Sequence, residues 1–115
     1  MNGTLNKVML IGRVADAIKL TYFDSENCVG RFVLATDDVS VNKQTQEKHI
    51  ITEWHHIVVR NKAAELFEKH LKKGDLLYVE GKIRTRLQRN GGSERHITEI
   101  LVTDFTFLPS GNTAK

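Results

Sequence analysis

A single change in hydrophobic spacing divides this chain. Apolar runs rich in Val, Ile and Leu, without helical spacing, occupy residues 5–14, 18–23, 28–36, 50–60, 76–89 and 95–108. Such runs, bounded by polar clusters, favour β-strands. Between the fourth and fifth runs, residues 61–73 place apolar side chains three and four positions apart, which is typical of an amphipathic helix. The chain is therefore predicted to be mostly β with one helix.

The helical segment carries signals at both ends. Asn61 is a residue type that caps helix N-termini, and Gly74 suits the left-handed position after a C-terminus. The apolar face is predicted to comprise Ala63, Leu66, Phe67 and Leu71. The helix is expected to pack this face against the strands.

The order of elements indicates a particular barrel. The run at 18–23 either continues the first strand or accompanies it, so the count is three strands, a helix and two strands. This is the connectivity of the OB-fold, a five-stranded barrel with its helix between strands three and four. We expect this domain to cover residues 1–109 and a short polar extension to cover 110–115. Other small α+β arrangements are compatible with the same order.

Two connections have distinct compositions. Residues 37–49 are polar and predict a long exposed loop or a loose hairpin. Residues 90–93 read Asn-Gly-Gly-Ser, which predicts a tight turn that pairs the last two strands as a hairpin.

Several functional classes lack a sequence signal. No apolar run approaches the ~18 residues of a membrane span, and the N-terminus does not resemble a signal peptide. Cys28 is the only cysteine, so no internal disulfide can form, which favours a reducing location such as the cytoplasm. The five histidines form no HExxH motif, and no Gly-rich phosphate loop is present. We predict no metal site and no cofactor.

The net charge of +3 conceals an uneven distribution. Residues 54–96 contain ten Lys or Arg and five Asp or Glu, a net of +5, whereas the segments on either side each carry −1. An anionic partner is therefore expected to meet the middle of the chain. A solvated, lysine-rich helix and hairpin would show the same charge.

Alternation along two strands places an aromatic side chain beside cations. Trp54, His56 and Arg60 share one side of their strand, opposite His55, Ile57 and Val59, of which the last two are predicted core. In the next strand, Lys82, Arg84, Arg86 and Gln88 share one side. Cations neutralise phosphates and an indole stacks on bases, so this pattern favours single-stranded nucleic acid. A buried core tryptophan and two solvated arginines are the competing interpretation.

Four blocks of sequence carry a resemblance to a known family. They are LNKVMLIG at 5–12, FVLAT at 32–36, TEWH at 52–55 and LKKGDLLYVEGKIRTR at 71–86. In order and spacing, over residues 5–108, they resemble the bacterial single-stranded DNA-binding proteins of the homotetrameric SSB family. The resemblance implies an OB-fold subunit that binds and protects single-stranded DNA without sequence preference in replication, recombination and repair. It also implies a homotetramer, although a dimer is compatible with the residues.

The resemblance implies roles for individual residues. Trp54 matches the family's stacking tryptophan, and His55 matches a position at its subunit interface. Positions that contact phosphates in the family match Lys7, Lys43, Lys62, Lys73, Arg84 and Arg86. By their place on the same strand sides, His56, Arg60 and Gln88 complete the predicted DNA-binding set.

The chain also departs from the family pattern. Aromatic residues of the family are replaced here by Ser40, Arg60, Gln88 and His96. Each base stack contributes about 1–3 kcal/mol, so we expect weaker and more salt-dependent binding than in a relative with all its aromatics. The family normally continues into an acidic tip that recruits partner proteins. Because this chain ends at Lys115 without one, no recruitment through such a tail is expected.

Other functions remain as alternatives. A tail-less, dimeric primosomal accessory protein shares the predicted fold, and an OB domain that binds proteins would show little or no DNA binding. An enzyme is disfavoured, because Asp37 and Asp38 are adjacent and point to opposite sides of an extended strand. Glu53 and His55 share a side, but it is the side assigned to core and interface.

Overall fold

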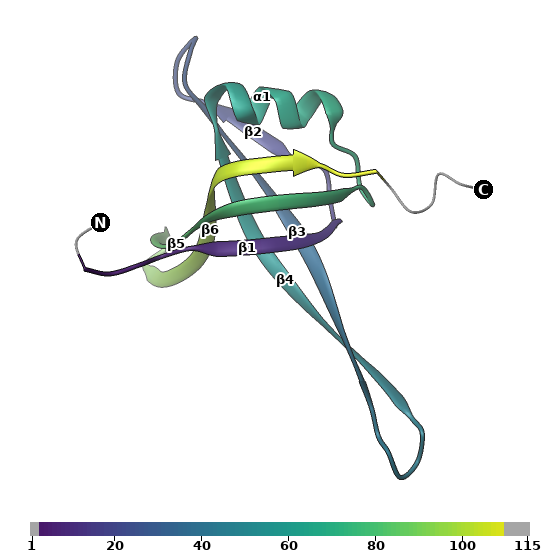
Figure 1. Cartoon of the computed structure of the whole chain (residues 1–115). Coiled ribbons are helices and arrows are strands. Elements are labelled where there is room, and N and C mark those ends of the chain that lie inside the picture. Colours follow the sequence, from purple (N-terminus) through teal and green to yellow (C-terminus); the bar gives the residue numbers. More distant parts are fainter. Residues whose placement is uncertain (1–2, 110–115) are drawn as a thin grey trace.

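Six strands and one helix follow the predicted order in the computed structural model, which describes residues 3–109 (Figure 1). The strands are β1 (Val8–Val14), β2 (Lys19–Tyr22), β3 (Cys28–Val41), β4 (Lys48–Arg60), β5 (Leu76–Asn90) and β6 (Ser93–Phe107), and the helix is α1 (Asn61–His70). The short β2 is a companion strand that pairs with β3. The predicted extension at 110–115 lies outside the described residues.

The strands close into a barrel. The sheet order is β1-β5-β6-β4-β3-β2, and β1 pairs with β3 as well as with β5, which closes a ring of five strands. The β4–β6 pairing is parallel, and the others are antiparallel. With β2 set aside, α1 follows the third barrel strand, so the predicted OB-fold is confirmed.

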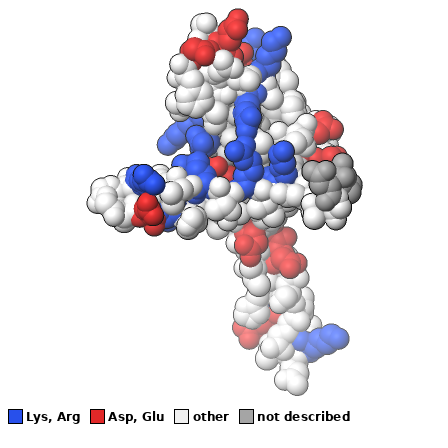
Figure 2. All heavy atoms as spheres, turned by 90° about the vertical axis from the view of Figure 1, so that its left-hand side faces the viewer, with Lys and Arg blue, Asp and Glu red and all other residues white. Residues whose placement is uncertain are grey.

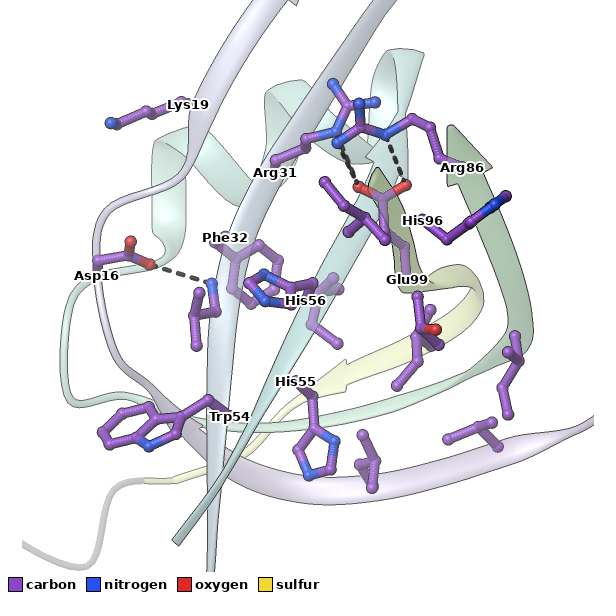
Figure 3. A pocket seen from close by; sticks show the side chains of 18 of the residues that line it. Asp16, Lys19, Arg31, Phe32, Trp54, His55, His56, Arg86, His96 and Glu99 are labelled. Carbon is purple, nitrogen blue, oxygen red and sulfur yellow. Dashed lines mark hydrogen bonds and ion pairs between the residues drawn. The ribbon is translucent and has the colours of Figure 1, made fainter. Parts of the chain in front are cut away.

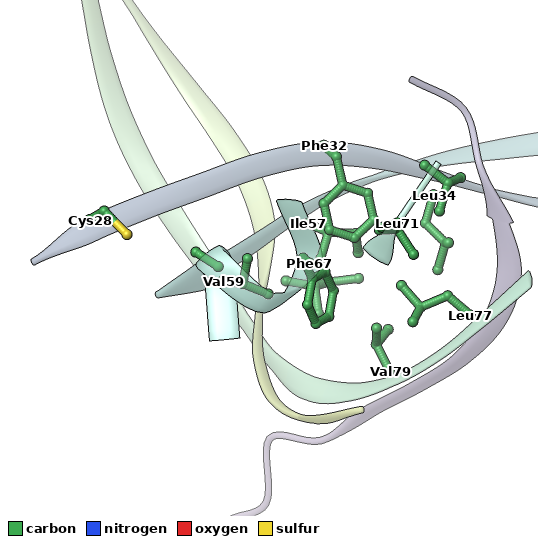
Figure 4. Packing of buried hydrophobic residues seen from close by; sticks show 12 residues of the cluster. Cys28, Phe32, Leu34, Ile57, Val59, Phe67, Leu71, Leu77 and Val79 are labelled. Carbon is green, nitrogen blue, oxygen red and sulfur yellow. The ribbon is translucent and has the colours of Figure 1, made fainter. Parts of the chain in front are cut away.

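Phe67 of α1 is the central contact of the core (Figure 4). Its side chain is fully buried, and its ring lies 4.6 Å from that of Phe105, 5.4 Å from that of Phe107 and 5.7 Å from that of Phe32, between ring centroids. The barrel interior beside it includes Ile57 and Val59, as predicted, and both are fully buried. One helix side chain thus joins strands from opposite parts of the barrel.

The predicted N-terminal cap of the helix is wrong. Arg60 occupies the N-cap position and makes no side-chain capping bond. Asn61 has a positive φ of 55°, and its Oδ1 accepts a hydrogen bond from the backbone N–H of Cys28 at 3.0 Å. The Asn61 amide therefore ties the start of β3 to the end of β4, and is not available to the helix.

The buried face of the helix also differs from the one predicted: it includes Ala64, whereas Ala63 is only partly buried. Ala64, Phe67 and Leu71 are buried, whereas Leu66 is 38% exposed. The helix ends at His70, so Gly74 does not terminate it. With a φ of +93°, Gly74 donates its N–H to the carbonyl of Val14 in the turn before β5.

No helix in residues 3–109 is long and apolar enough to cross a membrane.

Residues 37–49 form a hairpin, and most of them are strand. The pairing of β3 with β4 continues to Val41 and Lys48, and Figure 1 shows these strands leaving the barrel as a long arm. Asn42 turns the chain, because its Oδ1 accepts hydrogen bonds from the N–H groups of Gln44 and Thr45. Of the two predicted alternatives, a loop or a loose hairpin, the hairpin is correct. Its strands can be polar because an arm exposed on both sides needs no buried apolar face.

The β5–β6 hairpin agrees with prediction. Gly91 and Gly92 form its turn with φ of 54° and 93°. Two consecutive positive φ values are what a two-residue hairpin turn requires, and glycine adopts them without steric cost.

The helix packing generates a stability prediction. Replacing Phe67 with alanine should lower the free energy of unfolding by about 3–5 kcal/mol, because the change leaves a cavity among three other aromatic rings. Leu66→Ala, on the exposed side of the same helix, should cost less than about 1 kcal/mol. Urea unfolding followed by circular dichroism measures both, and equal losses would contradict the observed helix orientation.

Candidate nucleic-acid interface

Backbone pairing gathers the outward side chains of four strands on one continuous surface. Directly paired residues point to the same side of a sheet, so register alone defines the set. We call it the outer face; it consists of Val29, Arg31, Val33 and Ala35 of β3, Trp54, His56, Val58 and Arg60 of β4, Arg95, Ile97, Glu99 and Leu101 of β6, and Lys82, Arg84, Arg86 and Gln88 of β5. It bears six Lys or Arg and one carboxylate, a net of five positive charges.

Trp54 lies where β4 leaves the barrel for the arm. It pairs with Ala35, and 60% of its surface is exposed. The interpretation of Trp54 as a core residue is therefore wrong, because the barrel interior is filled from the other side of the strand. An exposed indole on a strand is free to stack against a planar ligand.

A groove of about 810 Å³ extends from Trp54 to residues of the outer face, and His55 and Ile57, from the other side of β4, also line it. Figure 3 shows Trp54 at one end, His56 in the middle, and Arg31, Arg86 and Glu99 together at the other end. Lys19 and His96 also contribute to its walls. The groove therefore offers an aromatic surface at one end and cationic groups at the other.

Arg31 and Arg86 meet at a buried carboxylate. Glu99 is only 7% exposed. Its Oε1 and Oε2 accept hydrogen bonds from Nε and Nη2 of Arg86 at 3.3 and 3.2 Å, and its Oε2 also accepts one from Nε of Arg31 at 3.2 Å. The two arginine side chains remain 43% and 37% exposed, so their outer ends face solvent.

Arg60 and Arg84 lie on the same face and line a second, smaller hollow above Val58. Within residues 3–109 neither makes an ion pair. Val58 points outward, yet it is only 7% exposed, because side chains of the outer face cover it. Figure 2 shows Lys and Arg gathered on the barrel above the arm, whereas the arm carries several acidic side chains.

The structure brings together six of the predicted binding residues. Trp54, His56, Arg60, Arg84, Arg86 and Gln88 lie along the outward sides of β4 and β5. The remaining four are on other elements: Lys7 just before β1, Lys43 in the arm's loop, Lys62 in the first turn of α1, and Lys73 between α1 and β5. Whether each of the ten contacts DNA stays a prediction.

Lys7 is already engaged in a network on the barrel wall. Its Nζ lies 3.3 Å from Oε1 of Glu80, and the hydroxyl of Tyr78 donates to Oε2 of Glu80 at 2.6 Å. The Tyr78 hydrogen bond, followed by the Lys7 contact, lowers the pKa of Glu80 below its usual range. The same hydrogen bond raises the pKa of Tyr78 to about 12. Lys7 therefore supports this wall as well as carrying charge.

His55 lies on the side of β4 opposite Trp54. It is half-buried, and its Nε2 is 2.9 Å from Oγ1 of Thr36 on β3. It shares the walls of the large groove with Val8 and Leu10 of β1. Its predicted role at a subunit interface stays a prediction.

The paired carboxylates Asp37 and Asp38 lie in the part of β3 that belongs to the exposed arm. Asp37 is on the exposed arm, and it accepts a hydrogen bond from the hydroxyl of Thr52 at 2.7 Å. In the part of the chain that the structure describes, no group of three or more His, Cys, Asp or Glu residues is placed to hold a metal ion.

Sequence reasoning missed Arg31 and Glu99. Arg31 is the only charged residue in the apolar run 28–36, and it alternates with the buried residues Cys28, Phe32 and Leu34. That alternation could have placed it beside His56 and Trp54. Glu99 carried no such signal, because its partners lie on two other strands and only the barrel brings them together.

Known proteins share both the sequence and the fold. The model of the single-strand binding protein family matches residues 5–108. A single-stranded DNA-binding protein of Bacteroides thetaiotaomicron is 44% identical over 114 residues, which cover 94% of this chain and 69% of that protein. A solved structure described as a Plasmodium falciparum SSB complex with ssDNA superposes with a TM-score of 0.81 at 36% identity, covering 95% of this chain and 100% of that one.

Proposed function

The chain belongs to the single-strand binding protein family, and from this premise we propose how it holds single-stranded DNA. A strand follows the outer face, with a base stacked on Trp54 and phosphates beside Arg60, Arg84 and Arg86. The observation that carries the proposal is the exposed indole of Trp54 on the same face as these cations. In a soluble domain, a tryptophan exposed in this way is a ready surface for stacking.

This mode of binding accounts for activity without sequence preference. Every base presents a π-face to an aromatic ring, and every nucleotide has the same phosphate. No ladder of side-chain amides or carboxylates lines the described outer face to read base edges. The protein would therefore coat whatever single strand is exposed during replication, recombination or repair, the processes that the family serves.

This chain has fewer aromatic residues for base stacking than the family pattern. Arg60, Gln88 and His96 occupy positions where the family has aromatic residues, which leaves Trp54 as the only tryptophan of the chain. Arg60 can stack its guanidinium plane on a base, and His96 stands at the wall of the groove. Binding should therefore depend more on phosphate neutralisation than on stacking.

We also propose that the subunit assembles into a homotetramer. Met9 and Ile11 on β1 are 61% and 57% exposed, and Leu5 before them is exposed as well. From Val8 to Gly12, β1 pairs with β5 on one side, and its pairing with β3 begins only at Arg13. A second copy that packs on this apolar edge would bury these side chains, and His55 lies beside the same strand.

The proposed role is binding and not catalysis. Its ligand is DNA, so the protein is expected to work in the cytoplasm where the bacterial nucleoid lies. Neither a cofactor nor a metal ion is needed for stacking and phosphate contact.

A substitution tests the stacking contact. Trp54→Ala should weaken binding to oligo-dT by about 5- to 150-fold, since one base stack is lost, while Trp54→Phe should recover most of the affinity. Fluorescence anisotropy of labelled oligo-dT measures both. Unchanged binding by a folded Trp54→Ala protein would overturn the stacking role. If oligo-dT also failed to quench wild-type Trp54 fluorescence, an OB domain that binds proteins would be favoured.

Salt titration tests the electrostatic contribution. If each subunit neutralises three phosphates, its affinity for oligo-dT should fall about 40-fold between 50 and 300 mM NaCl. A plot of log affinity against log salt gives the number of phosphates directly. An affinity that barely changes over this range would contradict the proposed contacts.

Native mass spectrometry tests the assembly. The expected mass is that of four chains, and Ile11→Asp should shift it to smaller species because a charge would be buried at the proposed contact. Val41→Asp, which places the same charge on the exposed arm, is the matched control and should leave the mass unchanged. A two-chain species for the wild type would favour the dimeric primosomal accessory protein.

A further inference from the structure

Arg31 is an outer-face cation to which the family resemblance assigns no role. It projects from β3, crosses the neighbouring strand β4 and reaches Glu99 on β6. Its path covers Val58, the residue that pairs with it on β4 and that is buried despite pointing outward. Arg31 thus lies flat over the sheet, with its guanidinium close to that of Arg86 (Figure 3).

Both arginines have N–H donors that do not bind Glu99. An arginine has five N–H donors. Arg86 uses Nε and one Nη2 donor on Glu99, and Arg31 uses only Nε, so seven donors of the pair remain after these hydrogen bonds. Both side chains are more than a third exposed, so these donors are open to a ligand in the groove. Each guanidinium group is planar, and its fork of N–H donors matches the oxygens of a phosphate.

The negative charge of Glu99 would repel the phosphates of a bound DNA strand. It is almost fully buried between cations, with Arg84 directly opposite it on β5. Without the carboxylate, Arg31 and Arg86 would repel each other and each long side chain would regain its rotamer freedom. DNA would then have to order both side chains when it binds, which weakens affinity.

We propose that Arg31 and Arg86 form a two-arginine clamp for the DNA phosphates, and that Glu99 is the positioning residue that holds the clamp in place before DNA arrives. This inference rests on the proposed function. It adds Arg31 as a DNA contact and assigns Glu99 a role that its own charge would not suggest. The negative charge lowers the overall attraction to DNA slightly, but the ordered pair of guanidinium groups more than offsets that loss.

The direction in which one substitution changes the affinity for DNA distinguishes a positioning role of Glu99 from a purely electrostatic one. Glu99→Gln removes a negative charge, so simple electrostatics predicts tighter binding to oligo-dT. The clamp predicts the opposite, a loss of about fivefold or more at 100 mM NaCl, because two side chains must be ordered on binding. Glu94→Gln is the matched control: it removes the same charge from an exposed ion pair with Arg89 on the same hairpin, and it should bind at least as tightly as wild type.

Arg31 provides a second measurement at a partly exposed side chain. Arg31→Gln should weaken binding and reduce the slope of log affinity against log salt by about 0.7. Arg31→Lys, which keeps the charge but not the planar fork, should recover only part of the affinity. In the double variant Arg31→Gln with Glu99→Gln, the two losses should be less than additive, because Glu99 acts partly through Arg31.

Each result bears on the proposal. Glu99→Gln that is folded by circular dichroism and binds as tightly as wild type overturns the positioning role. Arg31→Gln with unchanged affinity and salt slope overturns the clamp, whatever Glu99→Gln does. Failure of the wild-type protein to bind oligo-dT would instead overturn the proposed function itself.

Discussion

Closure of the barrel by β1 is the constraint on which the rest of the structure depends. β1 pairs with β5 along its length and with β3 at Arg13 and Val14. The crossing is tight, since a Cβ on Gly12 would lie 2.5 Å from the carbonyl oxygen of Ala35. Once the ring is closed, each strand has one side inside and one outside, and Phe67 fills the interior. Because the core side chains fill the interior, the alternate side chains of each strand lie on the outside of the barrel.

Closure also brings together residues that are distant in the chain. Arg31, Arg86 and Glu99 come from three strands and meet only because β4 lies between β3 and β6, and β6 between β4 and β5. In an open sheet their separation would depend on twist alone. In the barrel the sheet curves around a packed core, so the positions of the guanidinium groups are set by the core packing beneath them.

Much of the fold was predictable because the core is encoded in local patterns. Ile57 and Val59 alternate with Trp54, His56 and Arg60, and the helical spacing around Phe67 interrupts strand patterns only once. The error at Asn61 arose because its side chain has a distant partner: it has the residue type of a helix cap but accepts a hydrogen bond from the backbone N–H of Cys28. At residues 37–49 the polar composition left a loop and a hairpin open, because the strands there have no buried side, and the β3–β4 pairing decides for the hairpin.

The sequence by itself determined the type of fold, the family, and which face of each strand would carry Trp54, Arg84 and Arg86, because alternation and spacing are properties of neighbouring residues. Only the tertiary structure decided which of the cations share one surface, where Lys7 is engaged, and that a buried glutamate holds two arginines side by side. The physical reason is that hydrophobic pattern acts over a few residues, whereas ion pairs form between whichever charges the closed barrel brings within about 4 Å.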